Sequence, residues 1–348
     1  MKKKESFWYA VAHQEHLNKR GYIKLVRRVY LFIGGGFAVS LAVFIILALI
    51  GGIDKVIDII LSSRLYIYAL AFASVFLGYM LRFIKWNYFL KVLGLKVPFK
   101  KNISIYMSLY SMNITPGKIG RVIAAYTLNR VTKIGFANIV PIVTMDIFTD
   151  FMGFAVVALL AALYFHKFVT YVALIDIALL LPFVFILNDW LYNKLKKAFG
   201  KSRFIKTFTL YGEEYYQSQS KLNSPKVYAV SMLVTVPAAI LNSMTLFFAL
   251  LAIGVTPAFS GSVFVYSSSL VFGMISAVPG NIGVEDAALA ALASSMFHLS
   301  ASISSAVTIM TRLAELWFGV ILGGAFLLYT LKYWSPHTRE QKPQKNRP

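Results

Sequence analysis

Most of this chain is arranged in apolar runs, and several of them exceed the ~18 consecutive residues that mark a membrane-spanning helix. Only 14% of the 348 residues are charged, against roughly 25% in a soluble globular protein. No stretch shows the alternation of apolar and polar residues over ~10 positions that marks a membrane β-barrel. The sequence therefore predicts an all-α polytopic membrane protein.

We expect about six full spans and two interrupted apolar segments. The predicted spans are residues 29–51, 65–90, 137–164, 168–187, 227–252 and 302–331. The interrupted segments, 103–130 and 260–297, each contain the pattern Pro-Gly-x-Ile-Gly. As a helix, the first arm from Ile103 to Thr115 would reach only ~20 Å, less than the ~30 Å hydrocarbon core. Each interrupted segment is therefore predicted to be a re-entrant, broken hairpin.

The distribution of Lys and Arg orients the chain, because basic loops stay on the cytoplasmic side. Basic residues collect in segment 1–28, in loop 188–226, which contains eight, and in tail 332–348, whereas segment 253–301 contains none. With a re-entrant first hairpin, all three basic segments are cytoplasmic. We expect a multi-pass protein of the cytoplasmic membrane with both termini inside, an interfacial N-terminal segment, an amphipathic loop and a disordered tail.

Net charge and cysteine content limit the partners and the chemistry. A net charge of +21 would suggest nucleic acid in a soluble protein. Here the charge flanks the spans, so we expect membrane lipids, anionic ones above all, and no nucleic acid. The absence of cysteine excludes disulfides, thiolate nucleophiles and cysteine-ligated metals.

The two interrupted segments also indicate an internal repeat. The pattern occurs at residues 116–120 and 279–283, which are 163 positions apart. The same shift aligns span 65–90 with the later span 227–252. After a first span and external loop at 29–64, we therefore predict two repeats, 65–187 and 227–331, of inverted topology. Secondary transporters commonly have this plan, with the substrate site between the repeats. The alternative is that both Pro-Gly pairs are ordinary surface turns.

The residues around both loops are candidates for binding substrate. They are Asn113, Thr115, Pro116, Gly117, Lys118, Gly120 and Arg121 in the first loop, and Pro279, Gly280, Asn281, Gly283, Glu285 and Asp286 in the second. Lys118 and Arg121 begin a helix, where cations oppose the dipole, so we expect an anionic partner such as a lipid phosphate. Alternatively, both snorkel to cytoplasmic water. Glu285 and Asp286 either stabilise their helix N-terminus or bind a proton or cation during transport.

Two pairs of charged residues within predicted spans are candidates for gating or ion coupling. Asp146 and Asp150 are four positions apart and Arg312 and Glu315 three apart, so each pair shares a helix face. Charges at this depth normally face a protein interior or a cavity. Arg312 can pair with Glu315 locally or with Asp146 and Asp150 across the bundle, and such a pair can also be purely structural.

Two further basic residues, Arg82 and Lys85, lie nearer the cytoplasmic end of span 65–90. Long basic side chains near a helix end commonly extend their charge to the membrane surface. We expect both to snorkel in this way, and they are not included among the candidate site residues.

Signatures of enzymes and cofactors are few. The sequence contains no Walker loop, serine elbow or dinucleotide fingerprint, and its five histidines form no cluster with metal-ligand spacing. We therefore expect no cofactor, no metal and no catalytic residue. A membrane enzyme that uses Asp146 and Asp150 with a metal remains the less favoured alternative.

These motifs resemble the flippase-like membrane family that shares the transmembrane region of lysylphosphatidylglycerol synthases, over roughly residues 30–330. Its first loop has Asn, then Pro-Gly-basic-hydrophobic-Gly-acidic, which residues 113–120 match, while Arg121 stands where an acid is usual. Its second loop has Pro-Gly-Gly-hydrophobic-Gly and a later acid; here Asn281 replaces a glycine and Asp286 takes the acid position. Asp146 and Asp150 match two acids of a middle span, with Ile147 in place of an arginine, and Arg312 matches a basic residue of the last span.

The resemblance implies a flippase for an aminoacyl-phospholipid or a polyprenyl-phosphate lipid. We recognise no soluble synthase or glycosyltransferase domain, so we expect such an enzyme to be a separate partner. A non-transporting scaffold, which anchors a lipid-modifying enzyme through loop 188–226, is the alternative function.

Overall fold

The computed structural model describes residues 19–115, 120–165, 170, 172–174, 176–177, 212–276 and 278–334, and these form helices and connecting turns without a strand. The first half contains α2 (Lys19–Gly51), α3 (Ile53–Leu61), α4 (Leu65–Val92), α5 (Phe99–Ser108), the 3-10 segment η1 (Leu109–Met112), α6 (Val122–Thr132) and α7 (Phe136–Tyr164). The second half contains α11 (Gly212–Leu222), α12 (Pro225–Ala252), α13 (Phe259–Ile275), η4 (Pro279–Asn281), α14 (Val284–Phe297), α15 (Ala301–Arg312), the π-helical segment η5 (Leu313–Trp317) and α16 (Phe318–Trp334).

The described residues include five helices that are long and apolar enough to cross a membrane: Ile33–Gly51, Leu65–Val92, Phe136–Tyr164, Pro225–Ala252 and Ala301–Thr330. They coincide with five of the predicted spans. The remaining predicted span, 168–187, lies mostly outside the described residues, as do segment 1–18, most of loop 188–226 and tail 335–348.

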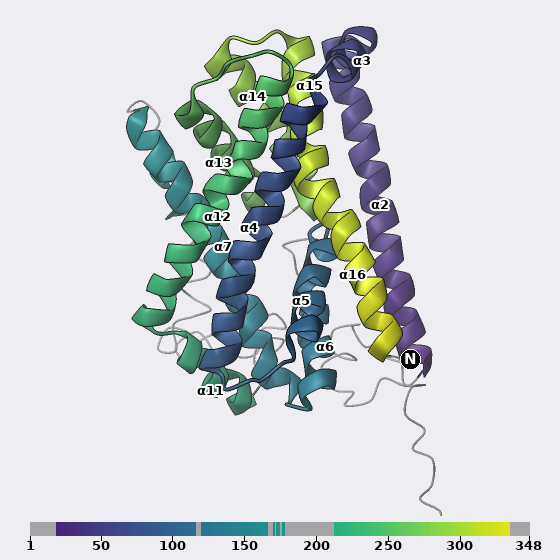
Figure 1. Cartoon of the computed structure of the whole chain (residues 1–348), viewed down its shortest axis with the longest axis vertical. Coiled ribbons are helices and arrows are strands. Elements are labelled where there is room, and N and C mark those ends of the chain that lie inside the picture. Colours follow the sequence, from purple (N-terminus) through teal and green to yellow (C-terminus); the bar gives the residue numbers. More distant parts are fainter. Residues whose placement is uncertain are drawn as a thin grey trace, which may run out of the picture.

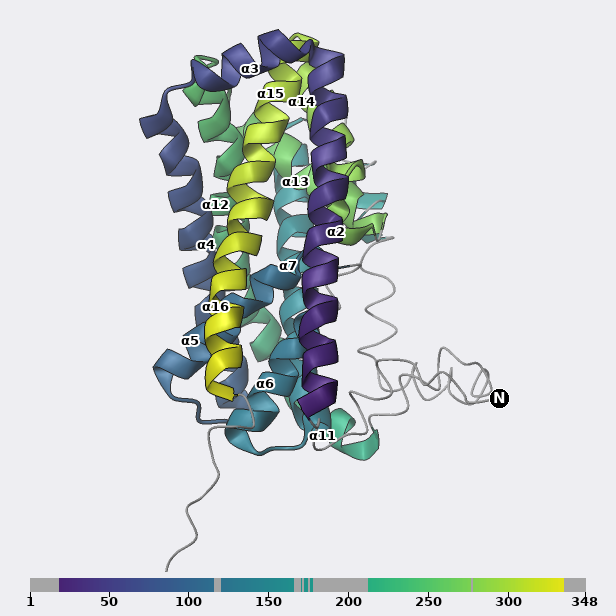
Figure 2. The ribbon, with the colours of Figure 1, turned by 90° about the vertical axis from the view of Figure 1, so that its right-hand side faces the viewer.

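The long helices run along the main axis of the molecule, and α3 lies across one end (Figures 1 and 2). The two interrupted segments occupy opposite halves. α5, η1 and α6 lie in the half where α2 begins, whereas α13 and α14 lie in the half beside α3. In each segment the first helix, α5 or α13, runs from its own end of the molecule towards the middle.

The inner ends of the two interrupted segments meet. Ile114 follows η1 and Ile282 follows η4, and both belong to one buried cluster with Leu316, Trp317 and Val320. The space beside Gly280 is also filled by Ile114, because a Cβ at this glycine would lie 3.4 Å from the Ile114 Cγ1. The two segments are therefore packed against each other from opposite ends.

The second loop requires backbone conformations that most residues avoid. Gly280 and Gly283 have φ of 63° and 87°, and Asn281 has φ of 56°. Glycine adopts this left-handed region without steric cost, and asparagine tolerates it better than most residues. Pro279 contributes no N–H donor to the turn. This accounts for the sharp break between α13 and α14 that the Pro-Gly pattern predicted.

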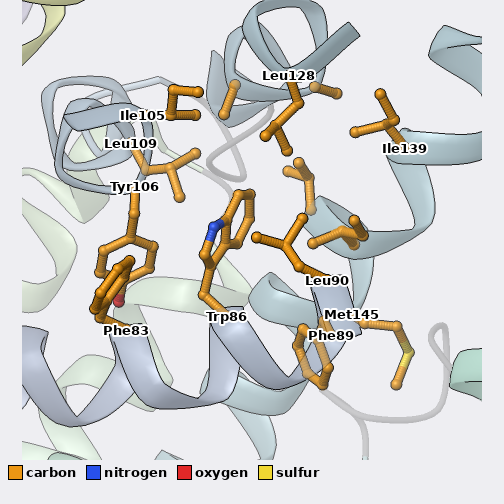
Figure 3. Packing of buried hydrophobic residues seen from close by; sticks show 14 of the residues in the cluster. Phe83, Trp86, Phe89, Leu90, Ile105, Tyr106, Leu109, Leu128, Ile139 and Met145 are labelled. Carbon is orange, nitrogen blue, oxygen red and sulfur yellow. The ribbon is translucent and has the colours of Figure 1, made fainter. Parts of the chain in front are cut away.

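Aromatic and aliphatic side chains join α4, α5, α6 and α7 in the half that contains the first interrupted segment. Figure 3 shows Trp86 of α4 between Tyr106 of α5 and Leu128 of α6, with Ile139 of α7 nearby. The Trp86 Nε1 donates to the Asn102 side-chain oxygen at 2.9 Å, so the buried indole has a partner. Within a membrane such packing, rather than water exclusion between helices, holds the helices together.

Contact between α16 and η1 depends on one glycine. A Cβ at Gly323 would collide with the Ser111 backbone nitrogen and would lie 2.9 Å from the Met107 carbonyl oxygen, whereas Gly324 has nothing within 4 Å. Because the backbone cannot move aside cheaply, we expect Gly323→Ala to lower the free energy of unfolding by about 1–3 kcal/mol. Thermal unfolding in detergent measures the loss. Gly324→Ala is the matched control and is expected to be neutral or stabilising by less than ~1 kcal/mol; equal melting temperatures would refute this packing.

Candidate functional site

Five buried charged side chains form a first cluster, hereafter the Asp146/Asp150 cluster. Arg82 and Lys85 come from α4, Arg121 immediately precedes α6, and Asp146 and Asp150 come from α7. All five are at most 3% exposed. The residues on α4 are three positions apart and those on α7 four apart, so each pair projects from one helix face. The cluster thus joins the first interrupted segment to two long helices.

Lys85 lies at the centre of this cluster. Its ammonium nitrogen is 3.1 Å from the Asp146 Oδ1 and 2.7 Å from the Asp150 Oδ1. It also donates to the Thr149 Oγ1 at 3.0 Å and to the Asp146 carbonyl oxygen at 3.1 Å. Lys85 therefore joins both carboxylates and a hydroxyl of α7 to α4.

The two arginines approach the carboxylates from either side. The Arg82 Nε is 3.2 Å from the Asp150 Oδ1, and its Nη1 donates to Asn242 of α12 at 3.1 Å. The Arg121 Nη1 is 3.2 Å from the Asp146 Oδ2 and 3.4 Å from the Asp150 Oδ2. Its Nε and Nη2 both donate to the Asn113 side-chain oxygen, at 3.1 and 2.8 Å.

A second cluster, hereafter the Arg312 cluster, lies at the second loop. The Arg312 Nη1 is 2.8 Å from the Glu285 Oε1 and 3.1 Å from the Glu315 Oε2, and its Nε is 3.1 Å from the Asp286 Oδ1. Its Nη2 donates to the Gly280 carbonyl oxygen at 2.7 Å. The guanidinium therefore ties α15 and η5 to the start of α14.

The two clusters have opposite charge imbalances. With all groups ionised, the Asp146/Asp150 cluster contains three cations and two carboxylates, so positive charge is in excess. The Arg312 cluster contains one cation and three carboxylates, so negative charge is in excess. Excess charge buried in a membrane protein is costly and normally marks a substrate or ion pathway.

Tyrosines connect the clusters. The Tyr79 hydroxyl donates to the Glu315 carbonyl oxygen at 3.2 Å, and its ring stacks on Tyr110 with 3.7 Å between centroids. Arg121 lies over the other ring, with its Cζ 5.6 Å from the Tyr110 centroid. A path of polar and aromatic groups thus runs from Arg121 to η5.

A family model of the lysylphosphatidylglycerol synthase transmembrane region matches residues 34–323. The chain belongs to this family. A comparison with curated proteins gives no match. The family name ties this region to enzymes that make a lipid, and the described structure has several helices that could span a membrane. The protein is therefore a multi-pass membrane protein of a family with a lipid-related function.

In this member of the lysylphosphatidylglycerol synthase transmembrane family, Arg82 and Lys85 do not snorkel. That prediction was wrong, because the two side chains are 3% and 0% exposed and pair with Asp146 and Asp150. A charge at this position can reach water only if its helix face is turned outwards, and here it faces α7. Their spacing of one helical turn, matching that of the two acids, was the available signal.

The structure distinguishes the alternatives for Arg121 and Arg312. Arg121 is 3% exposed, so it does not snorkel. The predicted anionic partner was a lipid phosphate, and in the structure Arg121 pairs with two protein carboxylates, Asp146 and Asp150. Arg312 makes the local pair with Glu315. Across the bundle, its partners are acids of α14 and not the pair on α7.

The remaining candidate residues line the two loops. The Thr115 Oγ1 accepts from the Gly120 N–H at 2.9 Å. Pro116, Gly117 and Lys118 themselves lie outside the described residues. In the second loop the Asp286 Oδ2 accepts from the Gly283 N–H at 2.7 Å, so Asp286 caps α14 as well as pairing with Arg312. Asn281 donates to the Glu285 Oε2 at 3.0 Å.

Proposed function

We propose that this protein moves an anionic or phosphate-bearing lipid across the cytoplasmic membrane, of the aminoacyl-phospholipid or polyprenyl-phosphate type. The observation that carries the proposal is the Asp146/Asp150 cluster, in which buried cations outnumber carboxylates and Arg121 also contacts Asn113. A lipid phosphate would complete its charge balance, and arginine can bind phosphate through two hydrogen bonds.

The transport path in this proposal runs between two inverted repeats. The interrupted segments act as re-entrant hairpins that enter from opposite faces, which is supported by their placement in opposite halves of the molecule (Figures 1 and 2). Loops broken at this depth are tolerated where protein or a water-filled cavity satisfies the backbone. The distribution of basic residues supports cytoplasmic termini.

The geometry gives less support to a metal-dependent enzyme. A metal-dependent enzyme would need Asp146 and Asp150 as ligands, but cationic side chains already surround their oxygens, and no group of three or more potential metal ligands occurs among the described residues. The scaffold relies on loop 188–226, of which residues 188–211 lie outside the described part. A separate lipid-synthesising or glycosyltransferase enzyme remains a proposed partner that supplies the lipid.

Reconstitution into vesicles tests this function. Vesicles with and without protein would contain a trace of a fluorescent anionic phospholipid, an aminoacyl-phospholipid, a polyprenyl phosphate or phosphatidylcholine. A membrane-impermeant reductant that bleaches the outer leaflet reports movement between leaflets. We expect protein to accelerate movement of the phosphate-bearing lipids with net negative or aminoacyl headgroups. Equal rates in protein-containing and empty vesicles for every lipid would overturn the proposal.

Arg121→Ala tests, in the same assay, whether the cations of the Asp146/Asp150 cluster bind the lipid. Hydrogen bonds to a charged group are worth about 1.5–3 kcal/mol, so we expect the rate of lipid movement to fall roughly 10- to 100-fold. Arg64→Ala, at an exposed arginine before α4, is the matched control and is expected to retain the wild-type rate. Equal rates in both variants would remove Arg121 from the proposed path.

A further inference from the structure

The carboxylates of the Arg312 cluster are compensated unequally. The Asp286 oxygens are taken up by the Gly283 N–H and the Arg312 Nε. Glu285 has one oxygen on Asn281 and the other on the Arg312 Nη1. Among the described residues, the partner of the Glu315 carboxylate is that same Nη1, at 3.1 Å, so Glu285 and Glu315 share one nitrogen. Like charges this close cannot both remain ionised cheaply in a dry interior.

Glu315 also lies where the helical backbone has an irregular hydrogen-bonding pattern. It belongs to η5, the π-helical segment between α15 and α16, and such segments often occur at functional sites. Its side chain is 13% exposed, whereas those of Glu285, Asp286 and Arg312 are each 2% exposed. Among these groups, Glu315 therefore has the best access to water or to a passing ligand.

A second observation points to a ligand at the same place. The Tyr266 hydroxyl of α13 is buried, and it has no hydrogen-bond partner among the described residues. Tyr266 is seven positions before Gly273 and so shares its face of α13, and a Cβ at Gly273 would lie 2.8 Å from the Glu285 Cβ. A buried hydroxyl normally finds a partner, so an unpaired one on the face that packs against Glu285 marks room for a group that is absent.

The titratable groups around this position come from every neighbouring element. Arg312 of α15 pairs with Glu315 and also with Glu285 and Asp286 of α14. Tyr266 lies on the face of α13 that packs against α14. From α4, Tyr79 donates to the Glu315 carbonyl oxygen. Three further elements contact η5, namely α12, α16 and α2. The titratable residues of α12 are Lys226 and Tyr228 in its first turn, those of α16 begin at Tyr329, and those of α2 end at Tyr30.

We propose that Glu315 and Glu285 together hold one exchangeable proton, and that exchange of this proton accompanies lipid movement. The proton comes from water, binds one carboxylate oxygen and returns to water, and no other bond changes. Binding removes one negative charge from the cluster and leaves Arg312 paired. Its use in transport rests on the proposed function, whereas the proton site does not.

Infrared spectroscopy of the purified protein in lipid nanodiscs tests the proton site without any lipid movement. A protonated carboxyl group gives a carbonyl band that shifts on exchange into deuterated water. At neutral pH we expect one such band in the wild type and its loss in Glu315→Gln or Glu285→Gln. Asp58→Asn, at an exposed residue of α3, should keep the band. Glu315→Asp, which keeps a carboxyl group, should also keep it and covers the case in which the glutamine variants do not fold.

The outcomes separate the proton site from the transport function. No band in the wild type, or an unchanged band in both glutamine variants, overturns the proton site. A band that appears only in sodium-free buffer also overturns it, because the site then takes sodium. In the vesicle assay, a pH gradient should change the wild-type rate and leave the Glu315→Gln rate unchanged. If the wild-type rate of lipid movement is the same with and without the pH gradient, only the coupling between proton exchange and lipid movement is overturned. If the infrared band is present but the protein moves no lipid, only the transport function is overturned.

Discussion

Arg312→Ala is expected to lower the free energy of unfolding by about 3–5 kcal/mol, because it leaves two buried carboxylates and one half-buried carboxylate without their cation. The change also removes the donor to the Gly280 carbonyl oxygen, which holds the second loop against α15. Thermal unfolding of the purified protein in detergent, followed by circular dichroism, measures the loss. Lipid movement should fall with it, since the second loop loses its anchor.

Two further variants define the cause of this loss. Arg64→Ala removes an exposed arginine and should change stability by less than ~0.5 kcal/mol. Arg312→Lys keeps the charge but loses the planar fork that reaches three carboxylates at once, so an intermediate loss is expected. If Arg312→Ala unfolds at the same temperature as Arg64→Ala, the Arg312 cluster does not hold the loop.

Asp150→Asn is the second change with a large expected effect, again about 3–5 kcal/mol of unfolding free energy. Asp150 lies against Arg82, Lys85 and Arg121, so neutralising it leaves these three cations with Asp146 as the remaining carboxylate of the cluster. The loss therefore arises mainly from uncompensated positive charge and less from the missing hydrogen bonds. The same thermal unfolding measurement applies.

A double variant tests this explanation directly. Lys85→Met with Asp150→Asn removes one charge of each sign and should be more stable than Asp150→Asn alone, a coupling expected for contacting residues. Asp58→Asn on α3 is the matched control, since Asp58 is exposed. A double variant that is less stable than the single one would show that Lys85 is not the source of the penalty.

Hydropathy was sufficient to predict the long helices, and the local spacing of residues was sufficient to predict some features of the candidate site. Five predicted spans correspond to helices, because a run of apolar residues determines both length and burial in lipid. The Pro-Gly pattern predicted the sharp break that Gly280 and Gly283 allow. The shared helix face of Arg312 and Glu315 made their pairing one of the two alternatives, and the structure contains that pair.

Contacts between side chains that are far apart in the sequence could not be predicted from hydropathy or local spacing. Whether Arg82 and Lys85 face water or protein depends on how α4 is rotated against α7, and one sequence does not determine this rotation. For Arg312, spacing left the acids of two different helices as candidates, and only the fold brings α14 to it. The π-helical segment that contains Glu315 likewise depends on tertiary packing rather than on a local residue pattern.

The contact between Ile114 and the second loop has a mechanical consequence. Because both segments end in the same packed layer, neither can withdraw alone without opening a void, which costs about 24 cal/mol per Å³. A displacement of one segment is therefore transmitted to the other through this packed layer. Opening towards one face of the membrane and closing towards the other would then be a single movement.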